Sequence, residues 1–225
     1  MAVNREELRL LCQKLNLFHL SKIETFDIDI NDKLEYLKFL LEYEIDERRK
    51  SVRNKNIAAS HIPCIDKEFE YTGIDKWNIE DLKKSNFIEK GQSLIIVGKC
   101  GKGKTKLTSD IGIGAIDKGY KVIYLKQEEL LKILKEKEYD SKQKNMFQKL
   151  KDADAIIIDE MMYLPIEKED VLVLYKGLMY LKSSRSLIIV TNRKLNEWKT
   201  INDDKHTMET LVDRLITDSR IISLK

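Results

Sequence analysis

The sequence predicts an α/β protein with a doubly wound parallel sheet, preceded by a small helical domain. Two observations lead to this fold class. From Gly91 onward, short apolar runs alternate with segments of helical periodicity, and the runs lack the polar residue at every second position that a half-exposed strand would carry. Strands that are apolar on both faces are typical of parallel sheets covered by helices on both sides. Before that region, apolar residues recur only at helical spacing.

Length and composition limit the class of protein. The chain has 225 residues, of which 42% are hydrophobic and 35% charged, with a net charge of +3. This size fits one main domain with a smaller accessory region. No run of about 18 apolar residues occurs, and the charged first residues do not resemble a secretory signal, so we expect a cytoplasmic protein with no membrane partner. The cysteines, Cys12, Cys64 and Cys100, are too widely spaced to predict a zinc site or a disulfide framework.

The N-terminal region is expected to form two helices. Apolar residues lie three or four positions apart in EELRLLCQKLNL (6–17) and again from Leu34 to Ile45. The second helix then turns basic in ERRKSVRNK (47–55) and must end near HIPC, because Pro63 disfavours helix for the residue before it. We therefore expect a helical domain over 1–62 that binds DNA or a partner, a linker over 63–90 and the α/β domain over 91–225.

Five apolar segments of the α/β domain are the expected strands. Helical segments separate them, as in a chain that crosses from one parallel strand to the next. The closing run is the shortest and could add the fifth strand. In chain order the segments are SLIIVG (93–98), KVIYLK (121–126), DAIIIDE (154–160), SLIIVTN (186–192) and IISL (221–224).

The first expected strand leads into VGKCGKGKT, which matches the phosphate-binding pattern GxxxxGK[ST]. A strand before this loop and a helix after it are the context that the pattern requires. The glycines let backbone N–H groups turn toward an anion, the lysine reaches the β and γ phosphates, and the threonine hydroxyl can bind Mg²⁺. We therefore expect ATP and Mg²⁺ as cofactors. The expected nucleotide-binding residues are Gly98, Lys99, Cys100, Gly101, Lys102, Gly103, Lys104 and Thr105.

Lys99 and Lys102 leave two interpretations open. They could add contacts to the phosphates, or they could be solvated side chains of a lysine-rich chain, since lysine acts as a flexible point charge. Cys100 has no second thiol nearby in the sequence, so we interpret it as incidental.

Two carboxylates end the third expected strand. In ADAIIIDE, Asp159 and Glu160 reach the edge of the sheet at which ligands bind in open α/β folds. Asp159 would hold Mg²⁺ together with Thr105, directly or through water. Glu160 would orient and deprotonate a water molecule that attacks the γ phosphate, so the pair predicts ATP hydrolysis. The alternative is an ordinary acidic strand end.

Asn192 and Arg214 complete the expected catalytic residues. Asn192 follows the fourth strand, where an amide can hold the attacking water or sense the γ phosphate, or can simply form a turn. Arg214 falls outside the apolar stripe of HTMETLVDRLITD. It could be a surface arginine, or an arginine finger that reaches the nucleotide of a neighbouring subunit. The pattern alone favours the surface interpretation.

Together these segments resemble the IstB/DnaC branch of the AAA+ ATPases, and most closely the IstB-like transposition helpers of insertion sequences. The resemblance implies a P-loop NTPase core of the AAA+ (ASCE) type, with Asn192 as sensor I and Arg214 as the arginine finger. It extends over almost the whole chain. The matching segments are VGKCGKGKT, DAIIIDEMMYLP, IIVTNRKLNEW and LVDRL, and upstream LNLFHLSKI, YLKFLLEYEIDERRK and FIEKGQSLIIVG.

Two departures from the family pattern are visible. Lys99, Cys100 and Lys102 stand where relatives usually carry prolines and a small residue, which changes the rigidity of the loop and with it the expected turnover. After Arg214 only about one more helical turn and a strand remain. We therefore do not expect the C-terminal lid domain of a typical AAA+ protein, nor the sensor II residue that it carries.

The resemblance also implies an ATP-dependent homo-oligomer that binds duplex DNA and presents it to a transposase. A basic helix end matches the arginine-rich stretch of the family and could contact DNA phosphates, with binding that falls steeply with salt. The alternative is a solvated helix terminus whose cations lie near the negative end of the helix dipole. The residues concerned are Arg48, Arg49, Lys50, Arg53 and Lys55.

Three other functions compete with this one. A DnaC-like loader of a replicative helicase would share the ATPase chemistry but would bind a hexameric helicase and prefer single-stranded DNA. A small-molecule P-loop kinase would transfer phosphate to an acceptor, although Glu160 and the lack of an arginine-rich lid segment between Lys126 and Asp154 argue against it. A nucleotide-gated scaffold with negligible turnover is the last alternative.

Overall fold

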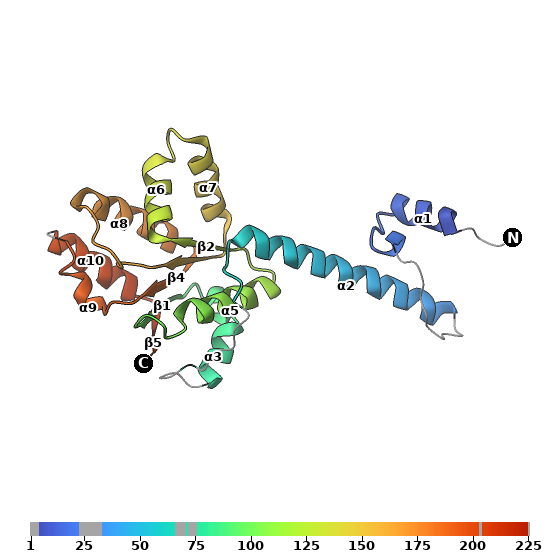
Figure 1. Ribbon diagram of the computed structural model, residues 1–225, viewed down its shortest axis with the longest axis horizontal. Helices are drawn as coiled ribbons and strands as arrows, with labels where there is room; N and C mark the ends of the chain where they lie inside the picture. Colours follow the sequence, from blue (N-terminus) through green and yellow to red (C-terminus); the bar gives the residue numbers. More distant parts are fainter. Residues whose placement is uncertain (1–4, 23–32, 66–70, 72–75, 203, 225) are drawn as a thin grey trace. The chain divides into compact units, whose positions relative to one another are not determined.

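The computed structural model describes residues 5–22, 33–65, 71, 76–202 and 204–224. Their contacts divide the chain into two compact units, Met1–Lys55 and Asn56–Lys225. The described part of the first unit is helical and the second contains a five-stranded sheet, which confirms the predicted fold class (Figure 1). The first elements along the chain are α1 (Arg5–Lys14), the 3₁₀ helix η1 (Leu20–Lys22) and α2 (Lys33–Ser60).

A buried carboxylate joins the elements of the N-terminal unit. Glu44 of α2 is 2% exposed, and its Oε2 accepts hydrogen bonds from the backbone N–H groups of His19 at 2.9 Å and Leu20 at 2.8 Å. Its Oε1 accepts a bond from Arg48 Nε at 2.8 Å, and the Arg48 guanidinium also donates to the Asn16 carbonyl. Burial opposes ionisation, but these donors together outweigh it and lower the pKa of Glu44.

Glu44→Gln should loosen η1 from α2 and lower the stability of this unit by about 1–3 kcal/mol, because partly buried donors lose a charged acceptor. Since folding lowers the pKa of Glu44, its contribution is complete above the ordinary glutamate value and is lost as the pH falls through the folded value. Hydrogen exchange of the His19 and Leu20 amides measures the effect. Glu42→Gln is the control, because the Glu42 carboxylate forms a surface ion pair with Lys38 at 3.8 Å and no other bond within the described part of the chain. Equal amide exchange in both variants would contradict the assignment.

The apolar stripe predicted for α2 lies at the surface of its unit. Leu37 is 52% exposed, Leu41 45% and Ile45 47%. Helical spacing shows that these residues share one face, but it does not show that the face is buried. Glu44 and Arg48 lie on the same side of the helix, three and seven positions after Leu41. Their polar contacts are the ones that hold the segment around η1.

The larger unit alternates strands with helices. Helices separate all successive strands, as expected for parallel connections. In chain order its remaining elements are α3 (Lys76–Lys83), α4 (Asn86–Glu89), β1 (Ser93–Gly98), α5 (Lys104–Asp117), β2 (Val122–Lys126), α6 (Gln127–Glu136), α7 (Ser141–Asp152), β3 (Ala155–Asp159), α8 (Lys168–Lys182), β4 (Ser186–Thr191), α9 (Leu195–Trp198), α10 (Lys205–Ile216) and β5 (Ser219–Leu224).

The boundary between the units differs from the predicted one. The structure divides the chain after Lys55, within α2, rather than after residue 62. Helices α3 and α4 lie in the region expected to be a linker, yet they belong to the larger unit. The reason is packing, since Leu82 and Phe87 are buried in the core formed around α5 and the sheet.

The sheet has the strand order β2-β3-β4-β1-β5, and every neighbouring pair is parallel. The five predicted strands are therefore confirmed, although the last begins at Ser219, two residues before the predicted start. Side chains of one strand enter two separate cores. In β1, Ile95 packs in the core with α6, α8 and α10, whereas Leu94 and Ile96 pack in the core with α5 (Figure 1). Helices thus cover both faces, which explains the apolar strands.

No helix among the described residues combines the length and the apolar composition needed to cross a bilayer.

Candidate nucleotide-binding and catalytic site

The phosphate loop connects β1 to α5, as its motif predicts. Gly101 and Gly103 have φ values of +77° and +79°, a left-handed conformation that other residues rarely adopt. The Lys104 ammonium donates a hydrogen bond to the Lys99 carbonyl at 3.0 Å, so its side chain folds back over the loop. Partial burial lowers the pKa of Lys104, against the opposing influence of Cys100 and Asp159. A bound phosphate anion would compensate this cation for its lost hydration.

The start of the loop lies against the last strand. A Cβ atom at Gly98 would lie 3.0 Å from both the Cβ atom and the carbonyl oxygen of Leu224. A side chain at this position would require Leu224 to move by a few tenths of an ångström, so glycine favours the close contact between β1 and β5. Lys99 is exposed and Lys102 partly exposed, and neither ammonium group bonds to a described residue. Both remain available to phosphates or to water.

The Asp159 carboxylate, which ends β3, is the most constrained group of the site. It is 5% exposed, and its Oδ2 accepts hydrogen bonds from Tyr124 at 2.7 Å and from Thr105 Oγ1 at 3.2 Å. Its Oδ1 accepts the Glu160 backbone N–H at 2.7 Å. Burial and the hydrogen bond to Asp159 raise the pKa of Tyr124, which keeps its hydroxyl a donor. The structure therefore brings Thr105 and Asp159 together, as a shared metal site requires.

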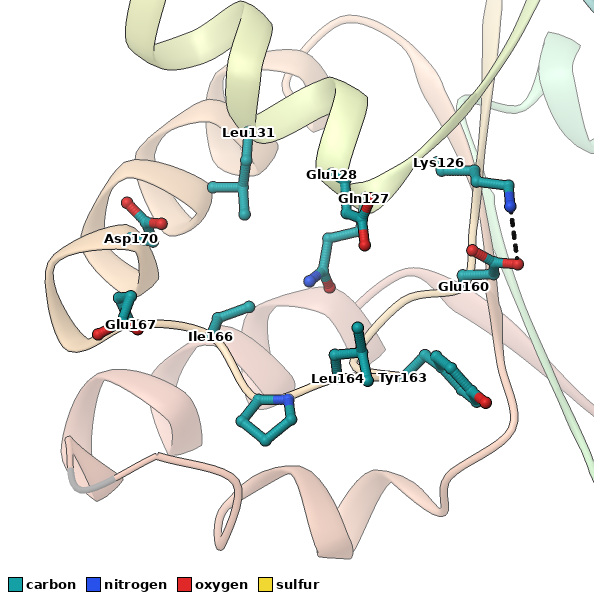
Figure 2. A pocket seen from close by; sticks show the side chains of 11 residues that line it. Lys126, Gln127, Glu128, Leu131, Glu160, Tyr163, Leu164, Ile166, Glu167 and Asp170 are labelled. Atoms are coloured by element: carbon teal, nitrogen blue, oxygen red, sulfur yellow. Dashed lines mark hydrogen bonds and ion pairs between the residues drawn. The ribbon is translucent and has the colours of Figure 1, made fainter.

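Glu160 is placed differently from Asp159. Its backbone is left-handed, with φ of 56°, and its side chain is half exposed. One carboxylate oxygen lies 3.0 Å from the Lys126 ammonium at the end of β2 (Figure 2). This bond raises the pKa of Lys126. In this arrangement one Glu160 oxygen is occupied by a hydrogen bond from a cation instead of being open to water.

A cavity of about 180 Å³ opens beside this ion pair. Figure 2 shows Lys126 and Glu160 at one end, with Tyr163 and Leu164 from the loop after β3 nearby. Gln127 supports that loop, since its side-chain oxygen accepts the Met162 N–H at 2.8 Å. A volume of this size holds several water molecules, each of which occupies about 30 Å³ in the liquid. Water therefore has room next to the expected base.

Lys126→Met is expected to raise ATP turnover several-fold. Both partners of the Lys126–Glu160 pair are about half exposed, so the pair adds less than about 1 kcal/mol to stability. Its loss leaves Glu160 free to accept a proton. Steady-state phosphate release at saturating ATP measures the change. Lys135→Met is the matched control, because it breaks a surface ion pair with Asp170 of 2.8 Å. Identical turnover in both variants and the parent protein would refute the proposal that Lys126 restrains Glu160.

Asn192 follows β4 and reaches the phosphate loop. Its Nδ2 lies 3.9 Å from the Cys100 sulfur, and its Oδ1 is buried without a hydrogen-bond partner among the described groups. A buried amide oxygen normally has a partner, so this acceptor suits a water molecule or a ligand donor. The structure thus brings Asn192 to the same edge of the sheet as Lys104 and Asp159.

Arg214 lies toward the opposite edge of the sheet. It is in the last turn of α10, which leads into β5, and β5 begins with Ser219 paired to Ser93, the first residue of β1. The phosphate loop follows Gly98 at the other end of β1, about 16 Å further along the strand. The Arg214 side chain is exposed and bonds to no other group that the structure describes. Its position does not bring it to the loop of its own chain.

The five basic residues of α2 differ in their surroundings. Arg48 is held by Glu44 and Asn16, as described above. Arg49 lies 3.5 Å from Asp46 and Lys50 lies 2.6 Å from Glu47, in pairs at the helix surface. Arg53 and Lys55 extend the basic run along the exposed helix.

Sequence reasoning missed the two β2 residues that contact the acidic pair. Tyr124 and Lys126 appeared only as part of an apolar strand. They are two positions apart and thus on one side of the strand, so the sequence could have indicated that both side chains contact the same neighbouring group. They contact Asp159 and Glu160 because β2 lies next to β3, and the sequence does not show this strand order.

The family model described as IstB-like ATP binding protein matches residues 23–225. The chain belongs to this family. ATP binding is the property that the description of this family names. The match spans both the AAA+ core and most of the N-terminal unit, in agreement with the resemblance of the separate segments.

Curated relatives of this IstB-like protein come from insertion sequences. The IS21 ATP-binding protein of Pseudomonas aeruginosa is 26% identical over 229 residues, which cover 97% of this chain and 86% of the relative. The IS232 ATP-binding protein of Bacillus thuringiensis subsp. berliner is 28% identical over 209 residues, or 89% of this chain and 84% of the relative.

Solved structures show the same fold. The DnaC helicase loader superposes with a TM-score of 0.57 at 17% identity, covering 66% of this chain and 87% of that one. DnaI superposes with a TM-score of 0.59 at 14% identity, covering 76% and 94%. AMPPCP-bound DnaA from Aquifex aeolicus gives 0.53 at 19% identity, covering 69% and 50%. The IstB-like chain thus has the P-loop AAA+ fold of these proteins.

Proposed function

We propose that this protein is an ATP-hydrolysing, DNA-binding AAA+ protein that assembles on duplex DNA and presents target DNA to a transposase. Its family and its insertion-sequence relatives support the link to transposition. The observation that carries the enzymatic part is the 3.2 Å contact between Thr105 of the phosphate loop and Asp159, beside Glu160. A loop, a metal ligand and a base at one edge of the sheet suit phosphoryl transfer to water.

The residues present fit a magnesium ion. Mg²⁺ takes oxygen ligands and is usually held by one or two protein groups together with water and phosphate oxygens. The Thr105 hydroxyl and the Asp159 carboxylate are such groups. When bound, Mg²⁺ would neutralise the charge that develops on the phosphate oxygens. Lys104 would hold the β and γ phosphates, and Glu160, once released from Lys126, would orient the attacking water and accept its proton.

Arg214 is proposed to act on the nucleotide of a neighbouring subunit. Its side chain is exposed, and α10 leads into the start of β5, which pairs with the start of β1. The loop of the same chain begins at the other end of β1, about 16 Å along the strand, so an interaction within one chain is disfavoured. An arginine supplied by a second subunit would stabilise the charge on the transferred phosphoryl group. The active form would then be a homo-oligomer with nucleotide sites between subunits.

We propose that α2 contacts DNA through its exposed cations. Arg49 and Lys50 have side chains that are 78% and 68% exposed, and their ion pairs within the helix are weak enough in water for phosphates to compete. Arg53 and Lys55 would extend this contact. Arg48 differs, because its bonds to Glu44 and Asn16 assign it to the fold of the unit. Contacts of this kind address the DNA backbone and carry little sequence information.

Fluorescence anisotropy of a labelled duplex tests this proposal. The protein should bind duplex DNA more tightly with ATP than with ADP, and each phosphate contact should steepen the loss of affinity with salt. Equal affinity with both nucleotides would refute nucleotide-dependent DNA binding. A preference for single-stranded DNA, together with a stable complex with a hexameric helicase, would favour a helicase loader instead.

A further inference from the structure

The Asp159 carboxylate is held from a side that the phosphate-loop motif does not include. Its Oδ2 receives two hydroxyl groups, Thr105 from the loop and Tyr124 from β2, and the Tyr124 bond is the shorter at 2.7 Å against 3.2 Å. We propose that Tyr124 is a positioning residue that fixes this carboxylate for the magnesium ion of the bound nucleotide. The proposal rests on the magnesium site described above.

The pairing of β2 with β3 sets the position of Tyr124 relative to Asp159. Tyr124 pairs with Ile157 in the register between β2 and β3, two residues before Asp159. Two residues of strand span about 6.6 Å, a length that a tyrosine side chain leaning along the strand can cover. The ring is 9% exposed and packs in the core with Leu107. The hydroxyl is therefore placed by a buried side chain on β2, which pairs with β3 at one edge of the sheet.

The two hydroxyl donors have different chemical roles. Thr105 is expected to turn its oxygen to the metal, so its contact with Asp159 changes when the ion binds. The Tyr124 hydroxyl bonds to Asp159 alone among the residues that the structure describes, and it can keep donating to Oδ2 when the metal binds. A carboxylate oxygen that accepts one hydrogen bond retains a lone pair for a metal ion or a metal-bound water. Tyr124 would thus set the direction of that lone pair.

A purely structural interpretation also exists, because a buried phenol needs a hydrogen-bond acceptor. The two interpretations differ in what the hydroxyl should affect. A structural hydroxyl contributes to stability alone. A positioning hydroxyl contributes to the affinity for the metal. Removing a hydrogen-bond partner of a metal ligand typically lowers that affinity by about 10–100-fold.

Tyr124→Phe removes only the hydroxyl and tests the proposal. Tyr120→Phe is the matched control, since Tyr120 also precedes β3 in the chain and donates to a carboxylate, Glu89, at 3.0 Å, but not to a residue of the site. For each protein, the affinity for fluorescent ADP is measured with EDTA and across a titration of MgCl₂. Binding of Mn²⁺ in the presence of ADP, followed by electron paramagnetic resonance, gives the metal affinity directly.

We expect Tyr124→Phe to bind ADP normally in EDTA, while its midpoints for Mg²⁺ and Mn²⁺ rise about tenfold or more. Tyr120→Phe should match the parent protein in all three measurements. Unchanged metal midpoints in Tyr124→Phe, or an equal shift in both variants, would overturn the role of Tyr124. If the parent protein itself showed no response to either metal, the proposed magnesium site would be contradicted. The inference about Tyr124 would then be contradicted as well.

Discussion

Glu160→Gln is expected to bind ATP as tightly as the parent protein while its rate of hydrolysis falls by about 10²–10⁴-fold. The amide keeps nearly the shape of the carboxylate but cannot accept the proton of the attacking water. Because the Glu160 side chain points to Lys126 rather than to the phosphate loop, its replacement should leave nucleotide contacts intact. Affinity for a fluorescent ATP analogue and single-turnover hydrolysis measure the two effects separately.

The control for this change is Glu167→Gln. Glu167 is an exposed carboxylate that lines the same cavity as Glu160 but contacts neither Lys126 nor the phosphate loop. It should hydrolyse ATP at the parental rate. A Glu160→Gln protein that hydrolysed ATP equally fast would remove Glu160 from the role of base, and loss of ATP binding would show that it holds the nucleotide.

Arg214→Ala is expected to lower hydrolysis by about 10³–10⁵-fold, the usual contribution of an arginine finger. The exposed side chain bonds to no other described group, so the fold should tolerate its removal. Arg214→Lys should recover little activity, because lysine lacks the planar fork that contacts two oxygens. Steady-state phosphate release and thermal unfolding of the parent protein and the two variants compare turnover with stability. A turnover loss matched by a loss of fold would contradict a catalytic role.

Mixing the two inactive variants distinguishes action within a chain from action between chains. A subunit with Arg214→Ala keeps its own Glu160, and a neighbour with Glu160→Gln keeps its Arg214. Sites formed between them are complete, so the mixture should regain turnover that neither protein shows alone. Absence of any recovery over a range of mixing ratios would contradict the action of Arg214 across a subunit boundary.

The sheet was predictable because its strands are buried on both faces. Runs such as SLIIVG and DAIIIDE have no other stable location than a sheet covered by helices, and the structure places each in a central strand. The beginning of β5 was less visible, since Ser219 and Arg220 join the strand through pairing with β1 and not through apolar character. Likewise, α3 and α4 carry too few buried residues to be distinguished from a linker by periodicity.

The candidate site was predictable where its residues follow one another or end neighbouring strands. The phosphate loop is a continuous motif, and Asp159 ends a buried strand at the edge where ligands bind. The contributions of Tyr124 and Lys126 depend on strand order and on side-chain direction, and no local pattern contains these. In the N-terminal unit, the sequence does not distinguish Arg48 from its basic neighbours. The structure does, because Arg48 contacts the buried Glu44.

Electron microscopy of the protein with duplex DNA and a non-hydrolysable ATP analogue tests the central claim most directly. The proposed function requires an assembly in which ATP joins subunits and the subunits hold DNA. Ordered rings or filaments should therefore form when both the analogue and the duplex are present, and should be lost without nucleotide or with ADP. Separate particles of the same size under all three conditions would contradict an ATP-dependent assembly on DNA.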